Sequence, residues 1–170
     1  LIPIINAVIF LKTPIAPLVQ EGESGLTMKE LFSNKLLWTF LLMMMSAGAS
    51  EQAVSQWTST FAEQALKVNK TVGDLAGPMT FAVLMGISRV YYGKYGSKIN
   101  LDRFMMYSSI LCIISYLSIA FIPHPILGFI GCGLCGLSVG ILWPGTLSKA
   151  AASIKNGGTT MFALLALAGD

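Results

Sequence analysis

The chain has 170 residues, of which 54% are hydrophobic and 11% charged, and its mean hydropathy is +0.70. Soluble domains carry about 25% charged residues, so this composition excludes an ordinary soluble protein. The net charge of +3 comes from basic residues spread over several connecting segments, which argues against a nucleic-acid-binding face, and three cysteines imply no disulfide framework.

The chain opens with an apolar stretch, residues 1–11, that predicts the end of a membrane helix. A polar connector follows over residues 12–35. In it, Thr27 and Glu30 have the spacing of a capping box, and the helix that they predict has one apolar side, as helices on a membrane surface do. A membrane span needs about 20 residues, and the apolar runs at both ends are shorter. We therefore expect an internal fragment of a longer protein.

Residues 36–170 predict an all-α, polytopic transmembrane bundle. The apolar runs exceed the length of strands, and they lack the alternation of polar and apolar residues that a membrane barrel needs. The predicted spans are about 36–66, 71–92, 103–122 and 125–154, with a truncated last span at 158–170. Asp102 is expected to cap the third span.

The basic residues alternate between the connecting segments. Nine of the eleven lie in the first connector or around the second and fourth gaps between spans: Lys12, Lys29, Lys35, Arg89, Lys94, Lys98, Arg103, Lys149 and Lys155. Only Lys67 and Lys70 lie in an intervening gap. Lysine and arginine in short loops are retained on the cytoplasmic side. The predicted cytoplasmic segments are therefore 11–35, 93–101 and 154–157.

Glu51 is the strongest single signal for a functional site. Counting from Leu36 places it about 22 Å into a hydrocarbon core about 30 Å thick, where an ionisable group tends to face a cavity or a partner. Gln52 and Gln56 share a helix face, and Trp57 follows. Such groups suit a polyhydroxylated solute, because amides offer donors and acceptors and an aromatic ring can stack on a sugar. Alternatively, they bond only to neighbouring helices or lie at the outer headgroups, with Trp57 as an interfacial anchor.

Arg89 is the second signal, near the predicted cytoplasmic end of its span. It can snorkel to the interface, or act as a gate latch that pairs with a carboxylate or a helix C-terminus in one conformation only. Gly93 and Gly96 are expected to permit a tight turn after it. With Lys94 and Lys98, these residues form the predicted gating segment.

The fourth span is rich in small residues. Gly136 and Gly140 form a GxxxG step, which permits close helix approach; close packing alone is the alternative to a functional role for these glycines. After them, Trp143 and Pro144 are expected to interrupt the helix beside a cavity. Trp143 would line the solute path, and Pro144 would allow the helix to flex.

The sequence offers no constellation for enzymatic chemistry. Cys132 and Cys135 are spaced as C-x-x-C, but no second pair, histidine or charged support lies near them in the sequence, so packing is the better interpretation. No Ser-His-Asp set, metal cluster or phosphate-binding loop is readable. We therefore expect neither an enzyme nor a bound metal or cofactor.

At three of these stretches the chain resembles the major facilitator superfamily, and within it sugar transporters of the fucose permease type. Residues 47–57 resemble that group's seventh helix, in which a carboxylate follows a run of small residues. Residues 89–98 resemble the basic loop between helices eight and nine, although Gly93 stands where an acid is usual and Arg89 where a glycine is. Residues 137–145 are similar to the tenth helix.

The resemblance implies that the chain runs from the end of helix six to the start of helix eleven, without the N-terminal six-helix half. It implies a secondary transporter in a bacterial inner membrane that moves a small polar solute, a sugar, by alternating access. Glu51 would be the coupling or substrate-binding acid, and proton coupling is a hypothesis that rests on this carboxylate alone. The alternatives are an exporter of drugs or metabolites on the same fold, and a membrane sensor or structural subunit that binds without translocating.

Overall fold

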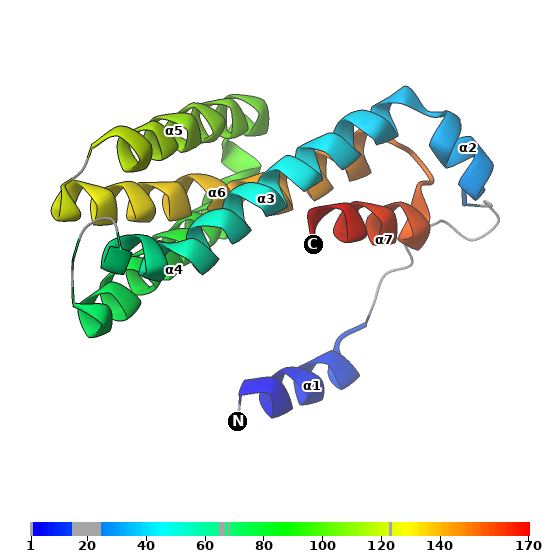
Figure 1. Cartoon of the computed structure of the whole chain (residues 1–170). Helices are drawn as coiled ribbons and strands as arrows, with labels where there is room; N and C mark the ends of the chain where they lie inside the picture. The colour runs from blue at the N-terminus through cyan, green and yellow to red at the C-terminus, as the bar shows by residue number, and fades with distance from the viewer. Residues whose placement is uncertain (1, 15–24, 65–66, 68, 123) are drawn as a thin grey trace.

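The computed structural model describes residues 2–14, 25–64, 67, 69–122 and 124–170. Over these residues the chain forms seven α-helices and one 3-10 helix, without a strand (Figure 1), which confirms the all-α fold class. The elements are α1 (Ile2–Lys12), α2 (Met28–Ser33), α3 (Lys35–Gln64), α4 (Lys70–Tyr95), η1 (Gly96–Lys98), α5 (Leu101–Phe121), α6 (Pro125–Ser153) and α7 (Gly158–Gly169). Of the predicted connector, residues 15–24 lie outside the described part.

The capping box at the start of α2 is confirmed. The Glu30 backbone N–H donates to the Thr27 hydroxyl, and the Thr27 backbone N–H donates to the Glu30 carboxylate at 2.8 Å. The hydrogen bonds from the Thr27 hydroxyl and backbone lower the pKa of Glu30. The box therefore fixes where this short helix begins.

The start of α5 differs from the prediction. The expectation that Asp102 caps this helix is wrong, because the Asn100 side chain accepts the backbone N–H of Arg103 at 3.1 Å and is the cap. Asp102 lies in the first turn of α5 and forms an ion pair with Lys149 of α6. This pair ties the start of α5 to the last part of α6.

α6 lies at the centre of the bundle, where it contacts α3, α4, α5 and α7 (Figure 1). The GxxxG step permits close approach, as predicted. A Cβ on Gly136 would overlap the carbonyl oxygen of Phe81 in α4, and one on Gly140 would lie 2.9 Å from the carbonyl oxygen of Met85. The spacing of α4 and α6 therefore depends on glycine at both positions.

The buried apolar residues form two clusters. One joins α2, α3, α6 and α7 through residues such as Leu31, Phe40 and Leu165. The other lies further along the bundle and contains Cys132 and Cys135. Both thiols are buried there among apolar side chains, the position that the packing interpretation predicts.

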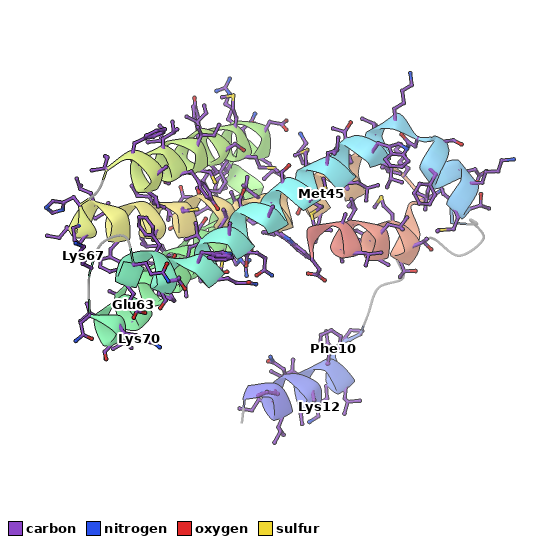
Figure 2. All side chains as sticks on the ribbon, in the orientation of Figure 1. Phe10, Lys12, Met45, Glu63, Lys67 and Lys70 are labelled. Carbon is purple, nitrogen blue, oxygen red and sulfur yellow. The ribbon has the colours of Figure 1, made fainter. Side chains whose placement is uncertain are left out.

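The connections between helices gather at the two ends of the bundle. α3 and α5 end, and α4 and α6 begin, at one end of the bundle, and Glu63, Lys67 and Lys70 lie there (Figures 1 and 2). The α6–α7 connection lies at the other end, where the Leu26 N–H donates to the Asn156 carbonyl at 2.9 Å. The predicted topology requires this grouping, and the assignment of the second end to the cytoplasm stays a prediction.

Three helical stretches among the described residues are long and apolar enough to cross a membrane, judged by length and composition. They are Lys70–Lys98, Leu101–Phe121 and Pro125–Ser153. The 30-residue helix α3 is not among them, because its second half carries the polar residues of the candidate site. The shorter apolar helices are α7 and α1, and α1 lies apart from the others in Figure 1.

The predicted interruption of the fourth span is wrong. α6 runs continuously from Pro125 to Ser153 with Pro144 inside it. A proline removes one hydrogen bond to the carbonyl four residues earlier, and that carbonyl finds another donor in this bundle, as described below.

The expectation that Gly93 and Gly96 permit a tight turn is also wrong. Gly93 lies inside α4 with open space around its Cβ position, and Gly96 opens η1 with φ of −55°. Neither residue adopts the backbone conformation that favours glycine. The turn between α4 and α5 therefore does not use the conformational freedom of glycine, although a Cβ on Gly96 would lie 3.0 Å from the Tyr92 ring.

Candidate functional site

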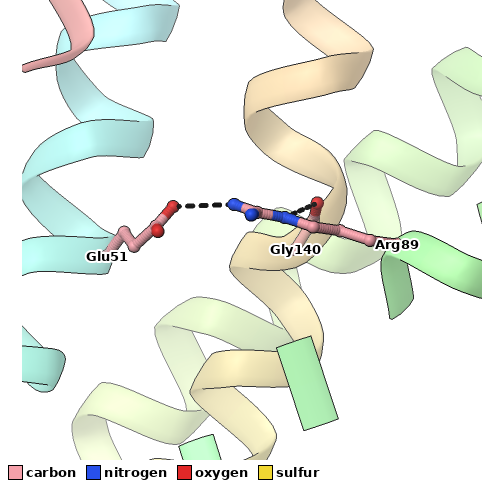
Figure 3. A network of polar contacts seen from close by, with 3 residues as sticks. All are labelled: Glu51, Arg89 and Gly140. Carbon is pink, nitrogen blue, oxygen red and sulfur yellow. Dashed lines mark hydrogen bonds and ion pairs between the residues drawn. The ribbon is translucent and has the colours of Figure 1, made fainter. Parts of the chain in front are cut away.

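The two residues with the strongest sequence signals form an ion pair in the structure. Arg89 Nη2 of α4 lies 3.3 Å from Glu51 Oε2 of α3 (Figure 3). The Arg89 side chain is 44% exposed and that of Glu51 27% exposed, so the pair borders open space. Ionisable side chains within a bilayer pair with one another or with backbone carbonyls. Arg89 does both.

The second acceptor of Arg89 is the Gly140 carbonyl of α6, to which its Nε–H donates at 3.4 Å (Figure 3). In a continuous α-helix this carbonyl would accept the backbone N–H four residues on. Here that residue is Pro144, which has no N–H. The spacing of Gly140 and Pro144 therefore leaves an acceptor for Arg89, whose guanidinium links α3, α4 and α6.

A cavity of about 240 Å³ surrounds this pair. Four helices line it, through Gly48, Glu51, Gln52, Arg89, Trp143, Gly169 and the adjoining Asp170. The Trp143 indole packs on Gly169, where a Cβ would lie 2.7 Å from the ring, and a Cβ on Gly48 would overlap the Gly169 carbonyl oxygen. Glycine at these two positions brings the end of α7 to the wall of the cavity.

The five predicted solute-binding residues occupy different positions relative to this cavity. Glu51, Gln52 and Trp143 line it. Gln56 lies one turn further along α3 and donates from Nε2 to Gln52 Oε1 at 2.8 Å, which fixes the orientation of the Gln52 amide. Trp57 is 67% exposed and does not line the cavity.

The sequence model of the Major Facilitator Superfamily matches residues 1–169. The chain belongs to the major facilitator superfamily. Members of this superfamily are secondary transporters that carry solutes across membranes, and the match spans every helix described above. The three long apolar helices agree with an integral membrane protein. No curated protein and no solved structure matches the chain.

The predicted gating segment of this major facilitator protein is divided between two places. Arg89 lies at the cavity, whereas Gly93, Lys94, Gly96 and Lys98 lie beyond it, at the end of α4 and in η1. The structure thus joins Arg89 with the predicted solute-binding residues. A latch function of the other four residues stays a prediction.

Sequence reasoning missed Asp170 at the cavity of this major facilitator protein. It follows the 12 residues of α7, and is therefore about 18 Å along an apolar helix. The cost of placing an ionisable group at such a depth, which singled out Glu51, is the signal that could have found it.

Sequence reasoning also missed that the Gly140 carbonyl is available to a side chain. The signal for it is Pro144, because a proline inside a helix leaves the carbonyl four residues earlier without its helical donor.

Proposed function

We propose that the protein is a secondary active transporter of a small polar solute, a sugar, and that it belongs with transporters of the fucose permease type. The observation that carries the proposal is the cavity in which Glu51, Gln52, Arg89 and Trp143 meet. The carboxylate and the guanidinium offer charged hydrogen-bond partners to hydroxyl groups, and the amide offers donors and an acceptor. The indole offers an apolar face for a sugar ring.

The chemistry of the cavity favours a polar solute. Its volume of about 240 Å³ belongs to the part of the site that these helices line, and the other half of the fold would complete it. An ion pair and an amide suit a polar solute better than an apolar drug. These features favour sugar transport over drug export, the alternative on the same fold.

We place the chain in the second half of the fold, from the end of helix six to the start of helix eleven. In this assignment α3 is helix seven, α6 is helix ten, and α2 belongs to the linker between the halves. An N-terminal six-helix half would close the cavity from its open side, and rocking of the halves would expose the site to each side of the membrane in turn. A bacterial inner membrane is the proposed location.

Glu51 is also the proposed site of proton coupling. As a carboxylate it holds the Arg89 guanidinium at 3.3 Å. A proton on Glu51 removes the negative charge and with it most of the attraction for Arg89, which then keeps only the Gly140 carbonyl. Protonation would in this way loosen the polar link between α3 and α4, next to the bound solute.

Uptake by the full-length protein in proteoliposomes tests the coupling role, with a panel of radiolabelled monosaccharides and an imposed proton gradient. Glu51→Gln is expected to abolish accumulation against a solute gradient while downhill exchange persists. Glu63→Gln is the matched control, because Glu63 lies near the end of the same helix and outside the cavity, and it should leave accumulation unchanged. Undiminished accumulation by Glu51→Gln would exclude the coupling role.

Arg89→Gln and Gln52→Ala test the solute site. A hydrogen bond to a charged group contributes about 1.5–3 kcal/mol, so Arg89→Gln should weaken apparent solute affinity about tenfold or more. Binding of a monosaccharide without flux in either direction would indicate a sensor. Efflux of apolar drugs without sugar uptake would indicate an exporter.

A further inference from the structure

A second hollow lies between α4 and α5, apart from the solute cavity. It has a volume of about 330 Å³, and α6 contributes to its lining through Leu137. The other lining residues include Ile87 and Tyr91 of α4 and Phe104, Tyr107 and Leu111 of α5. Apart from two serines and the tyrosine hydroxyls, these side chains are apolar, so this groove does not suit the polar solute proposed above.

The groove runs along the bundle for about a third of the thickness of a membrane. Its shallow end is at Phe104, three residues after α5 begins. Its deep end is at Leu111, seven residues further along α5 and so about 10 Å along the axis. The hydrocarbon core is about 30 Å thick, so a groove of this length fits within one leaflet.

Aromatic rings form the shallow end of the groove. The Tyr91 ring lies 6.0 Å from that of Phe104 across the α4–α5 boundary and 5.1 Å from that of Tyr95. Tyrosine is enriched where a membrane protein meets the headgroups. This end is therefore the one that faces the membrane surface.

Two basic residues stand beside these rings. Lys94 lies 5.4 Å from the centroid of the Tyr95 ring, and Arg103 lies one turn before the groove residue Tyr107 on the same face of α5. Within the described part of the chain, neither has a carboxylate at ion-pair distance; the neighbouring Asp102 is paired with Lys149 instead. Their charges are available to an anion at the mouth of the groove.

We propose that this groove binds an anionic phospholipid of the cytoplasmic leaflet, with one acyl chain along the groove and the phosphate at Lys94 and Arg103. Basic residues next to membrane helices on the cytoplasmic side attract anionic headgroups, and the apolar lining matches an acyl chain. The proposal rests on the membership of the superfamily and on the predicted orientation. It does not depend on the proposed transport function, because the site is separate from the solute cavity.

Native mass spectrometry of the full-length protein in detergent tests the headgroup contacts. The protein is titrated with phosphatidylglycerol or with phosphatidylcholine of the same acyl chains. Phosphatidylglycerol is expected to bind about tenfold more tightly, because each of two basic residues adds to the attraction for an anionic headgroup. Lys94→Gln/Arg103→Gln should remove this preference, while Lys29→Gln/Lys155→Gln, which removes two charges from the same end of the bundle, should keep it. Equal binding of the two lipids, or equal loss in the two variants, would overturn the proposal.

A pair of tryptophan substitutions tests the acyl-chain position. Ile87→Trp fills the groove, whereas Val83→Trp adds the same side chain one turn away, at a position that is 55% exposed and outside the lining. The number of retained phosphatidylglycerol molecules should fall by one with Ile87→Trp only. The assignment would be overturned if a folded Ile87→Trp protein retained every phosphatidylglycerol molecule. It would also be overturned if a protein partner, and not lipid, competed for the groove.

Discussion

Gly136 of α6 lies directly against the backbone carbonyl of Phe81 in α4, with no space for a side chain between them. Arg89 is two turns beyond Phe81 along α4, and Gly140 is one turn beyond Gly136 along α6. The close approach at the first position therefore sets the distance at which the Arg89 side chain meets the Gly140 carbonyl. A packing contact between two helices in this way determines the geometry of the candidate site.

Gly136→Ala is expected to destabilise the protein. Overpacking of a protein interior lowers the free energy of unfolding by about 1–3 kcal/mol. The loss should be at the upper end of this range, because the atoms that a Cβ would overlap belong to the Phe81 backbone, which cannot move aside as a flexible side chain can. Gly86→Ala is the control, since nothing lies within 4 Å of its Cβ position and replacing glycine by alanine inside a helix gains roughly 0.5–1 kcal/mol. Thermal unfolding in detergent should show a lower melting temperature for the first variant only. Equal melting temperatures would contradict the close approach of α4 and α6.

Pro144→Ala is expected to impair solute uptake through Arg89. The new backbone N–H would occupy the Gly140 carbonyl, which now accepts from Arg89 Nε at 3.4 Å. The variant should keep its fold, because alanine is the most favourable residue in a helix interior. The apparent affinity for the transported solute would therefore fall while the melting temperature does not.

A comparison in two backgrounds separates this explanation from a general effect of helix flexing. In a protein that already carries Arg89→Gln, Pro144→Ala should have little additional effect on affinity, because the donor is gone. Additive losses in the double variant would show that Pro144 acts independently of Arg89.

Gly93→Ala is expected to raise the melting temperature and, through the predicted gating role of Gly93, to slow transport. Gly93 lies in the helical part of α4, and nothing lies within 4 Å of its Cβ position. The free energy of unfolding should rise by roughly 0.5–1 kcal/mol, which is the cost of glycine relative to alanine inside a helix. Uptake rates in proteoliposomes check the second half of the prediction: unchanged uptake by a more stable protein would mean that α4 need not bend at this glycine.

Acid is expected to loosen the start of α2. The hydrogen bonds from Thr27 lower the pKa of Glu30 from its ordinary value of 4.5. The capping box therefore contributes stability that is present above pH 4.5 and is lost as the pH falls through the pKa of the folded state. The Trp38 indole donates to the Phe32 carbonyl of α2 at 3.0 Å and can report this change. In a protein whose other tryptophans are phenylalanine, Trp38 fluorescence should titrate below pH 4.5, and the Glu30→Gln variant should lack this transition.

Sequence patterns predicted the helices well, because hydrophobic runs and their polar gaps are local signals. The cost of an ionisable group in lipid also identified Glu51 and Arg89 separately. A carboxylate partner for Arg89 is one interpretation of the sequence, but Glu51 could not be identified as that partner, since the two residues are 38 apart and meet only because α3, α4 and α6 pack together. The same limit applies to Asp170, whose role depends on where α7 lies relative to α3.

The errors have a common physical cause. The local preferences of proline and glycine predict irregular backbone at Pro144, Gly93 and Gly96. Inside a packed bundle, the hydrogen bond lost at Pro144 is compensated by Arg89, and the glycines adopt ordinary helical conformations. Tertiary contacts therefore determine the backbone conformation at positions where local preference alone predicts a break in the helix.

The four-residue interval between Gly140 and Pro144 makes this part of α6 sensitive to changes in chain length. One residue inserted or deleted within it would pair the proline ring with a different carbonyl, and would turn every later side chain by about 100° around the axis. Trp143 would leave the cavity and Lys149 would leave Asp102. Sequences that align with this chain should thus vary in length within the turns and not between these two positions.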